Sequence, residues 1–238
     1  MVDRQVQERL AVAAEATARL LDALRDIDDA WCRAPSALPD WTRGHVLTHL
    51  ARNADGLARL ASTTAEGHGA GMYGPGGARE ADIEAGAHRS ATELVDDVRD
   101  SAARLDQTCH QLPDHVWDVV TEWRAGRRQP VRDIAVARVV EVEVHRVDLD
   151  AGYSPGDWPD ASVDLLLGAA LARLAGAPEP PRLRVQVDGR AGTHGSEDPD
   201  AIIVSGPGHH LVVWLTGRGD GSGLRCDGPL PDLPAAWA

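Results

Sequence analysis

The sequence lacks long apolar runs, and this absence argues against a membrane-spanning protein. No stretch approaches the roughly 20 uninterrupted apolar residues that a membrane span requires, and residues 1–4 show no sign of the apolar core of a signal peptide. Lysine and phenylalanine are absent, so all 24 basic residues are arginine, a bias that we attribute to a GC-rich genome. We therefore expect a cytoplasmic protein without a membrane partner.

Cysteine is also scarce, and acidic residues outnumber basic ones. The three cysteines, Cys32, Cys109 and Cys226, lie far apart and form no CxxC motif, which excludes a disulfide framework and a thiolate metal cage. We expect them to be small buried hydrophobic residues. The net charge of -13 would repel a phosphate backbone, so we expect no nucleic-acid partner.

What is present is the composition of an ordinary globular protein. The chain has 238 residues, of which 43% are hydrophobic and 26% charged. Its character changes after residue 152, from helical patterns to short strand patterns separated by Gly and Pro. The sequence therefore predicts an α+β protein with two domains, residues 1–152 and 153–238, and we expect a monomer.

Apolar residues recur at spacings of three and four in the first domain and predict its helices. The pattern predicts helices over residues 4–27, over 43–65 after an N-cap near Thr42, and over 91–112 after a capping box of Ser90 and Glu93. Between Gly67 and Gly77, eight of eleven residues are Gly, Ala or Pro. This loop is long enough to suspect of a role at a site.

The segment 131–149 is ambiguous. Residues 140–145 alternate strictly, as in a strand, but nineteen residues without Gly or Pro are typical of a helix. We interpret the segment as a helix, with one stripe of valines expected to face the core: Val136, Val140, Val144 and Val147. In the second domain, the pattern predicts helices over 161–174 and 210–215 and strands over 183–187, 201–204 and 224–226.

Two of the predicted helices carry pairs of potential metal ligands. As a helix, residues 131–149 place Glu141 and His145 four residues apart on one face, flanked by Arg138 and Asp148. His45 and His49 have the same spacing on an earlier helix. Facing helices of a bundle commonly build metal sites in this way, and three ligands of the His, Glu, His type leave a fourth position open. The alternatives are histidines hydrogen-bonded in a core and a solvated Glu141 paired with Arg138.

Several runs of the sequence resemble one known family. Residues 38–53, Met72–Tyr73 with residues 78–84, and residues 141–149 closely resemble the mycothiol-dependent maleylpyruvate isomerase family, and the resemblance continues through residues 204–206 and 214–218 to Trp237. It implies a DinB-like four-helix bundle followed by a small C-terminal α/β domain similar to sterol carrier protein 2 (SCP2-like).

The same resemblance implies site residues. It implies that His49, Glu141 and His145 bind a divalent metal, which we expect to be zinc, and that Arg79 is catalytic. His45 would lie beside the ligands rather than among them. We expect Arg138 and Asp148 to orient the ligands, and we assign no role to His209 and His210.

The implied activity is the cis–trans isomerisation of maleylpyruvate to fumarylpyruvate with the small-molecule thiol mycothiol. A metal-bound thiol is held as thiolate, which adds to the double bond and leaves again after rotation. Arg79 would bind a substrate carboxylate or the enolate oxygen. Two alternatives remain open: a mycothiol S-transferase acting on another electrophile, and a non-enzymatic protein that binds a metal or ligand.

Overall fold

A computed structural model describes residues 3–68, 71–73 and 78–233 of the chain. The chain forms two compact units, Met1–Tyr153 and Ser154–Ala238. That these units are separately folding domains remains a prediction. Residues 69, 70 and 74–77 of the predicted loop and Trp237 lie outside the described residues.

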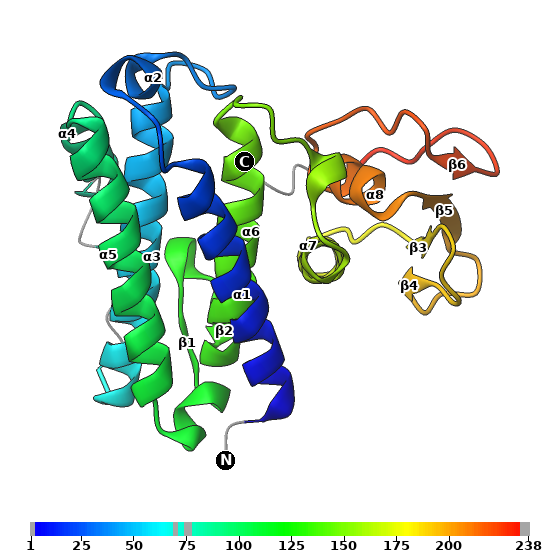
Figure 1. Ribbon diagram of the computed structural model, residues 1–238. Helices are drawn as coiled ribbons and strands as arrows, with labels where there is room; N and C mark the ends of the chain where they lie inside the picture. Colours follow the sequence, from blue (N-terminus) through cyan, green and yellow to red (C-terminus); the bar gives the residue numbers. More distant parts are fainter. Residues whose placement is uncertain (1–2, 69–70, 74–77, 234–238) are drawn as a thin grey trace. The chain divides into compact units, whose positions relative to one another are not determined.

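Four long helices lie side by side in the first unit (Figure 1). They are α1 (Arg4–Ala23), α3 (Arg43–Ala65), α5 (Ala91–Gln111) and α6 (Ile134–Asp148). Helix α3 packs against both α5 and α6, and α1 packs against α6. Two short helices, α2 (Asp29–Arg33) and α4 (Ala78–Gly86), complete the unit, which confirms the predicted helical bundle. No helix within the described ranges is long and apolar enough to cross a membrane.

Helix starts follow the predicted capping residues. Thr42 accepts a hydrogen bond from the backbone of His45 at the start of α3, and Ser90 and Glu93 form the predicted capping box of α5. Helix α1 ends at Ala23, before the predicted Ile27, because the chain turns there and Asp28 caps the new helix α2.

The ambiguous segment is the helix α6, preceded by a 3-10 turn (Val131–Asp133). The predicted valine stripe is partly wrong: Val136 and Val147 are only half-buried, whereas Val139 and Val142 are fully buried. Other chain segments cover α6 on more than one side, so burial does not follow a single stripe. A hairpin that the sequence did not predict precedes α6. It is formed by β1 (Val120–Glu122) and β2 (Arg128–Pro130), with 3-10 turns at Asp114–Asp118 and Arg124–Gly126.

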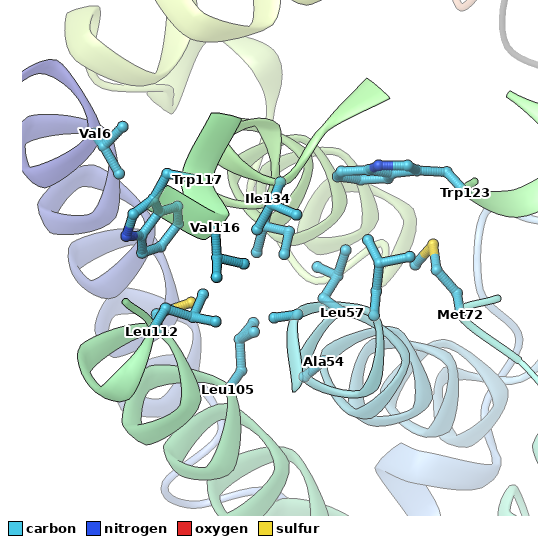
Figure 2. Packing of buried hydrophobic residues seen from close by; sticks show 14 residues of the cluster. Val6, Ala54, Leu57, Met72, Leu105, Leu112, Val116, Trp117, Trp123 and Ile134 are labelled. Atoms are coloured by element: carbon cyan, nitrogen blue, oxygen red, sulfur yellow. The ribbon is translucent and has the colours of Figure 1, made fainter. Parts of the chain in front are cut away.

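The core of the bundle contains aromatic and aliphatic side chains from several elements. Figure 2 shows Leu57 of α3, Leu105 of α5 and Ile134 of α6 converging near Trp117 and Trp123. Burying a side chain of this size stabilises the fold by about 1.5–3 kcal/mol. This packing holds α3 and α6 together and so fixes the seam between them.

The second unit is a small α/β structure. A four-stranded sheet has the order β4-β3-β5-β6, with β3 (Leu183–Val187) parallel to β5 (Ile202–Gly206) and with the short edge strands β4 (His194–Gly195) and β6 (Arg225–Cys226) antiparallel to their neighbours. Helices α7 (Asp160–Ala175) and α8 (Gly208–Leu215) pack against each other. A 3-10 turn at Pro155–Asp157 precedes α7 in the chain. The predicted α+β fold class is confirmed; β4 was not predicted.

Candidate metal centre

The candidate centre lies where the start of α3 meets the end of α6. Arg43 of α3 donates from Nε to the carbonyl of Leu149 and from Nη2 to that of Asp150, at 2.7 Å each. These bonds satisfy carbonyls at the C-terminal end of α6. Because the start of one helix is fixed to the end of the other, early residues of α3 face late residues of α6.

Three potential ligands meet across this seam. The Oε2 atom of Glu141 lies 2.9 Å from Nε2 of His49 and 3.3 Å from Nε2 of His145. One ligand atom from each residue lies within 4.8 Å of the other two. His49 is buried, while Glu141 and His145 are half-buried, so the cluster is partly exposed to solvent.

Asp148 fixes the ring of His145. Its Oδ2 lies 2.8 Å from Nδ1 of His145 and accepts a hydrogen bond from the Nδ1–H group, which leaves Nε2 directed at the cluster. The sequence analysis expected this role for Asp148. Arg138 has a different role, because its Nη1 donates to the carbonyl of Leu50 at 2.8 Å and to Asn53 Oδ1 at 3.3 Å, within the seam.

Burial and charge set the protonation of the cluster. Burial lowers the pKa of His49 to about 4, against the pull of Glu141, so His49 is neutral at pH 7. Burial acts in the same direction on His145, but its hydrogen bonds to Asp148 and Glu141 outweigh burial and raise its pKa. Burial would raise the pKa of Glu141, but hydrogen bonds from His145 and His49 hold it well below its usual range. The centre therefore contains a carboxylate and at least one neutral imidazole.

Helix α4 brings Arg79 to the same place. Its Nη2 donates to Nδ1 of His49 at 2.9 Å, and its Nη1 donates to Glu80 at 3.1 Å. Its guanidinium lies over the ring of Tyr73, 5.6 Å from the centroid. The buried Nε of Arg79 has no hydrogen-bond partner among the described residues. A cation whose side chain is 13% exposed and whose Nε–H has no partner is suited to an anionic oxygen.

These residues fit a divalent ion of the zinc type. Ligands at zinc distances of 2.0–2.1 Å in a tetrahedron lie about 3.3 Å apart, close to the 2.9 and 3.3 Å between donor atoms here. Two imidazoles and one carboxylate are also a donor set that zinc accepts, with a fourth position open. The hydrogen bond from Arg79 to His49 does not fit a metal on Nε2 of His49. Such a metal requires a proton on Nδ1, and the resulting N–H group cannot accept a hydrogen bond from Arg79.

Comparisons with known proteins identify the family of the chain. Residues 13–150 match the family model described as the mycothiol maleylpyruvate isomerase N-terminal domain. The chain belongs to this family. A search of curated protein sequences gave no match.

Two solved structures resemble this family member over most of its length. A crystal structure of a mycothiol-dependent maleylpyruvate isomerase is 27% identical in sequence, with a TM-score of 0.80 over 96% of each chain. The structure of a variant of that isomerase, with one histidine replaced by alanine, is 26% identical, with a TM-score of 0.79 over 96% of each chain. The similarity thus covers both units of the chain.

In this member of the maleylpyruvate isomerase family, two of the three cysteines are buried too deeply to react as thiolates. Cys32 and Cys109 are buried, as predicted, and Cys226 is half-buried. Burial raises the pKa of Cys32 to about 11 and that of Cys109 to about 12. Both thiols are protonated at neutral pH and are poor nucleophiles.

Other residues of interest lie outside the cluster. His45 does not lie against the ligands: its ring nitrogens face Thr42 and Glu84. His209 and His210 belong to α8 in the second unit, with ring centroids 4.5 Å apart. Tyr73 was not predicted as a site residue, although Met72–Tyr73 belongs to the runs that carry the family resemblance. A single tyrosine beside a Gly-rich loop gives no signal of its own.

Proposed function

We propose that this chain is a mycothiol-dependent isomerase that converts maleylpyruvate into fumarylpyruvate, with a zinc ion held by His49, Glu141 and His145 and with Arg79 as a catalytic residue. The observation that carries the proposal is the three-donor cluster in contact with the half-buried Arg79, in a chain that belongs to this family. When bound, the ion and mycothiol would supply a thiolate that adds reversibly to the cis double bond, which becomes a single bond and can rotate before the thiol is eliminated.

The three proposed ligands would hold a metal and leave its fourth coordination position open. Asp148 holds the proton of His145 on Nδ1, so Nε2 presents its lone pair to the cluster. His49 is already neutral because of its burial. The single carboxylate of Glu141 balances half the charge of a divalent ion, which leaves one positive charge to favour a thiolate over a thiol.

Arg79 is placed to stabilise negative charge on the substrate. Its Nη2 donates to Nδ1 of His49 at 2.9 Å, while its buried Nε has no hydrogen-bond partner among the described residues. His49 could offer Nε2 to an ion only with its own proton on Nδ1. An N–H group there cannot accept a hydrogen bond, so Nη2 of Arg79 would be left to donate elsewhere. Two free N–H groups on a planar fork match a carboxylate or the oxygen of an enolate.

Two of the three cysteines are not suited to replace mycothiol in this reaction. Cys32 and Cys109 are buried and their pKa values are raised to about 11 and about 12. Cys226 is half-buried on the edge strand β6 and belongs to no group of potential metal ligands in the described part of the chain. A thiol supplied as a small molecule accounts for a site built without a protein thiol.

The test is an assay of the purified chain with zinc, mycothiol and maleylpyruvate. We expect fumarylpyruvate to form only when both metal and thiol are present, with no net consumption of the thiol. A stable conjugate between mycothiol and another electrophile, without isomerisation, would instead identify an S-transferase. Metal binding without turnover of either kind would identify a non-enzymatic binding protein and overturn the proposal.

A further inference from the structure

A second group of potential metal ligands lies near the start of α3, apart from the first centre. Nε2 of His45 lies 3.3 Å from Oε2 of Glu84, and Nε2 of His88 lies 3.4 Å from Oε1 of the same carboxylate. One donor atom from each residue lies within 4.8 Å of the other two. Each separation is close to the roughly 3.3 Å expected between two ligands of one tetrahedral zinc ion. Because the two histidines approach different oxygens of Glu84, this carboxylate would bind the ion through both oxygens or turn to offer one.

Two glycines bring the second ligand group together. A Cβ on Gly44 of α3 would lie 2.3 Å from the carbonyl oxygen of Ala87, and one on Gly86 of α4 would lie 2.5 Å from a methyl group of Thr48. The end of α4 therefore approaches the start of α3 more closely than any larger residue would allow. The segment after α4 is held there by Arg89, which donates to the carbonyl of Gly86 at 3.0 Å and to Asp97 at 2.6 Å.

His45 is the fixed member of the group. Only 8% of its side chain is exposed, and its Nδ1 lies 2.7 Å from the hydroxyl of Thr42 and 3.1 Å from the Thr42 backbone N–H. A metal on Nε2 requires a proton on Nδ1, and the Thr42 hydroxyl oxygen can accept a hydrogen bond from that N–H group. The backbone N–H of the half-buried Thr42 would then lose its bond to His45, and this loss reduces the affinity for the ion.

The two groups share no ligand. The indole of Trp41 contacts both histidines, with ring centroids 6.0 Å from His45 and 5.9 Å from His49. Glu84 and His88 come from α4 and the turn that follows it, whereas Glu141 and His145 come from α6. Each group can therefore be emptied by a substitution that leaves the other intact.

We propose that His45, Glu84 and His88 form a second site for a divalent ion of the zinc class, which fastens α4 to α3. Two imidazoles and one carboxylate favour zinc over magnesium or calcium. The site should bind zinc at least about tenfold more weakly than the first centre, because Glu84 and His88 are each 70% exposed and must be ordered. Its position is relevant to the first centre because α4 also carries Arg79, which contacts His49.

The test is a titration of the metal-free full chain with Zn²⁺, read as bound metal per chain by equilibrium dialysis. Wild type should bind two equivalents, and Glu84→Gln and His88→Ala should each bind one. Glu141→Ala should keep only the weaker equivalent, which separates this proposal from the first centre. A wild type that saturates at one equivalent, or a second equivalent that persists in both Glu84→Gln and His88→Ala, would overturn it.

His110 provides a matched control. It also has a carboxylate four residues earlier, with Nδ1 of His110 3.4 Å from Asp106, and its side chain is 72% exposed, but this pair belongs to neither three-ligand group. His110→Ala should therefore still bind two equivalents. The second equivalent should also slow hydrogen exchange of the amides in residues 78–86 in wild type but not in His88→Ala, and equal exchange in both would contradict the fastening of α4.

Discussion

Arg79 donates from Nη2 to Nδ1 of His49 at 2.9 Å, so the proposed catalytic residue is bonded to a proposed metal ligand. A metal on the other ring nitrogen requires a proton on Nδ1, and this proton excludes the bond from Arg79. The two states of His49 are therefore alternatives, and metal binding and the release of Arg79 are coupled. By reciprocity, whatever draws Arg79 away from His49 should favour the metal.

This coupling predicts that Arg79→Ala does not weaken metal binding. The substitution removes the hydrogen bond from Nη2 of Arg79 to Nδ1 of His49, which a proton on Nδ1 would exclude, and a positive charge beside the proposed ligands. We expect the zinc affinity to be equal to that of wild type or up to about tenfold tighter. The measurement is competition with a chelator of known affinity.

Asp148→Asn is the matched comparison in the same assay. It removes the carboxylate that orients His145 at 2.8 Å, so it should weaken zinc binding by about tenfold to a hundredfold. If Arg79→Ala weakened binding as much as Asp148→Asn does, Arg79 would support the metal rather than compete with it.

Zinc affinity should depend on pH through His145. Its hydrogen bonds to Asp148 and Glu141 raise its pKa, so the ring gains a proton in the metal-free protein as pH falls. That proton must leave before Nε2 can bind metal. Below the pKa of His145 the affinity should fall about tenfold per pH unit, and above it the affinity should level off. His49 contributes nothing to this dependence near neutrality because its pKa is about 4. Dissociation constants that are equal across pH 5 to 8 would contradict this assignment.

The ligand pairs show how far sequence alone reaches. The spacing of four residues placed Glu141 and His145 on one helix face, and the same spacing placed His45 with His49. Spacing could not tell which histidine of the second pair faces α6, because that depends on how α3 is rotated in the bundle. Only the family resemblance favoured His49, and the structure brings His49 to Glu141 while His45 faces Glu84. Their assignment as metal ligands remains a prediction.

Helix α6 shows why the rest could not be predicted. Valines spaced three and four residues apart predicted one buried stripe, yet Glu143 is 1% exposed and accepts hydrogen bonds from Arg19 and Tyr153 at 2.7 Å each. These partners lie 124 and 10 residues away in the sequence. A buried carboxylate in an apolar pattern is satisfied only by such tertiary contacts, which no local periodicity contains.

Metal content tests the ligand assignment directly. Wild type purified and dialysed without chelator should retain about one tightly bound divalent ion per chain, and His49→Ala and Glu141→Ala should lose it, since removing one of three ligands weakens binding by orders of magnitude. Elemental analysis gives the content, and circular dichroism checks the fold. Undiminished metal in both variants would show that the tight site lies elsewhere.

Activity should not require the protein's own thiols. Replacing Cys32 and Cys109 by Ala and Cys226 by Ser removes two buried protonated thiols and one half-buried thiol. We expect lower stability, by roughly 1 kcal/mol for each buried position, and thiol-dependent turnover close to that of wild type at a temperature where the variant is folded. A folded variant without turnover would point to a protein nucleophile.

The last prediction separates substrate binding from metal binding. Arg79→Lys keeps the positive charge next to His49 but loses the planar fork, so it should keep full metal content and fold. Its kcat for maleylpyruvate should fall by about tenfold to a thousandfold, because a lysine cannot make two parallel hydrogen bonds to a carboxylate or stabilise an enolate as well. Arg79→Ala should lose at least as much. Metal analysis and steady-state kinetics on the same preparations check both parts. Wild-type kinetics in both variants would reduce Arg79 to a structural neighbour of His49, and the enolate would then need another partner, for which the nearby Tyr73 is the first residue to test.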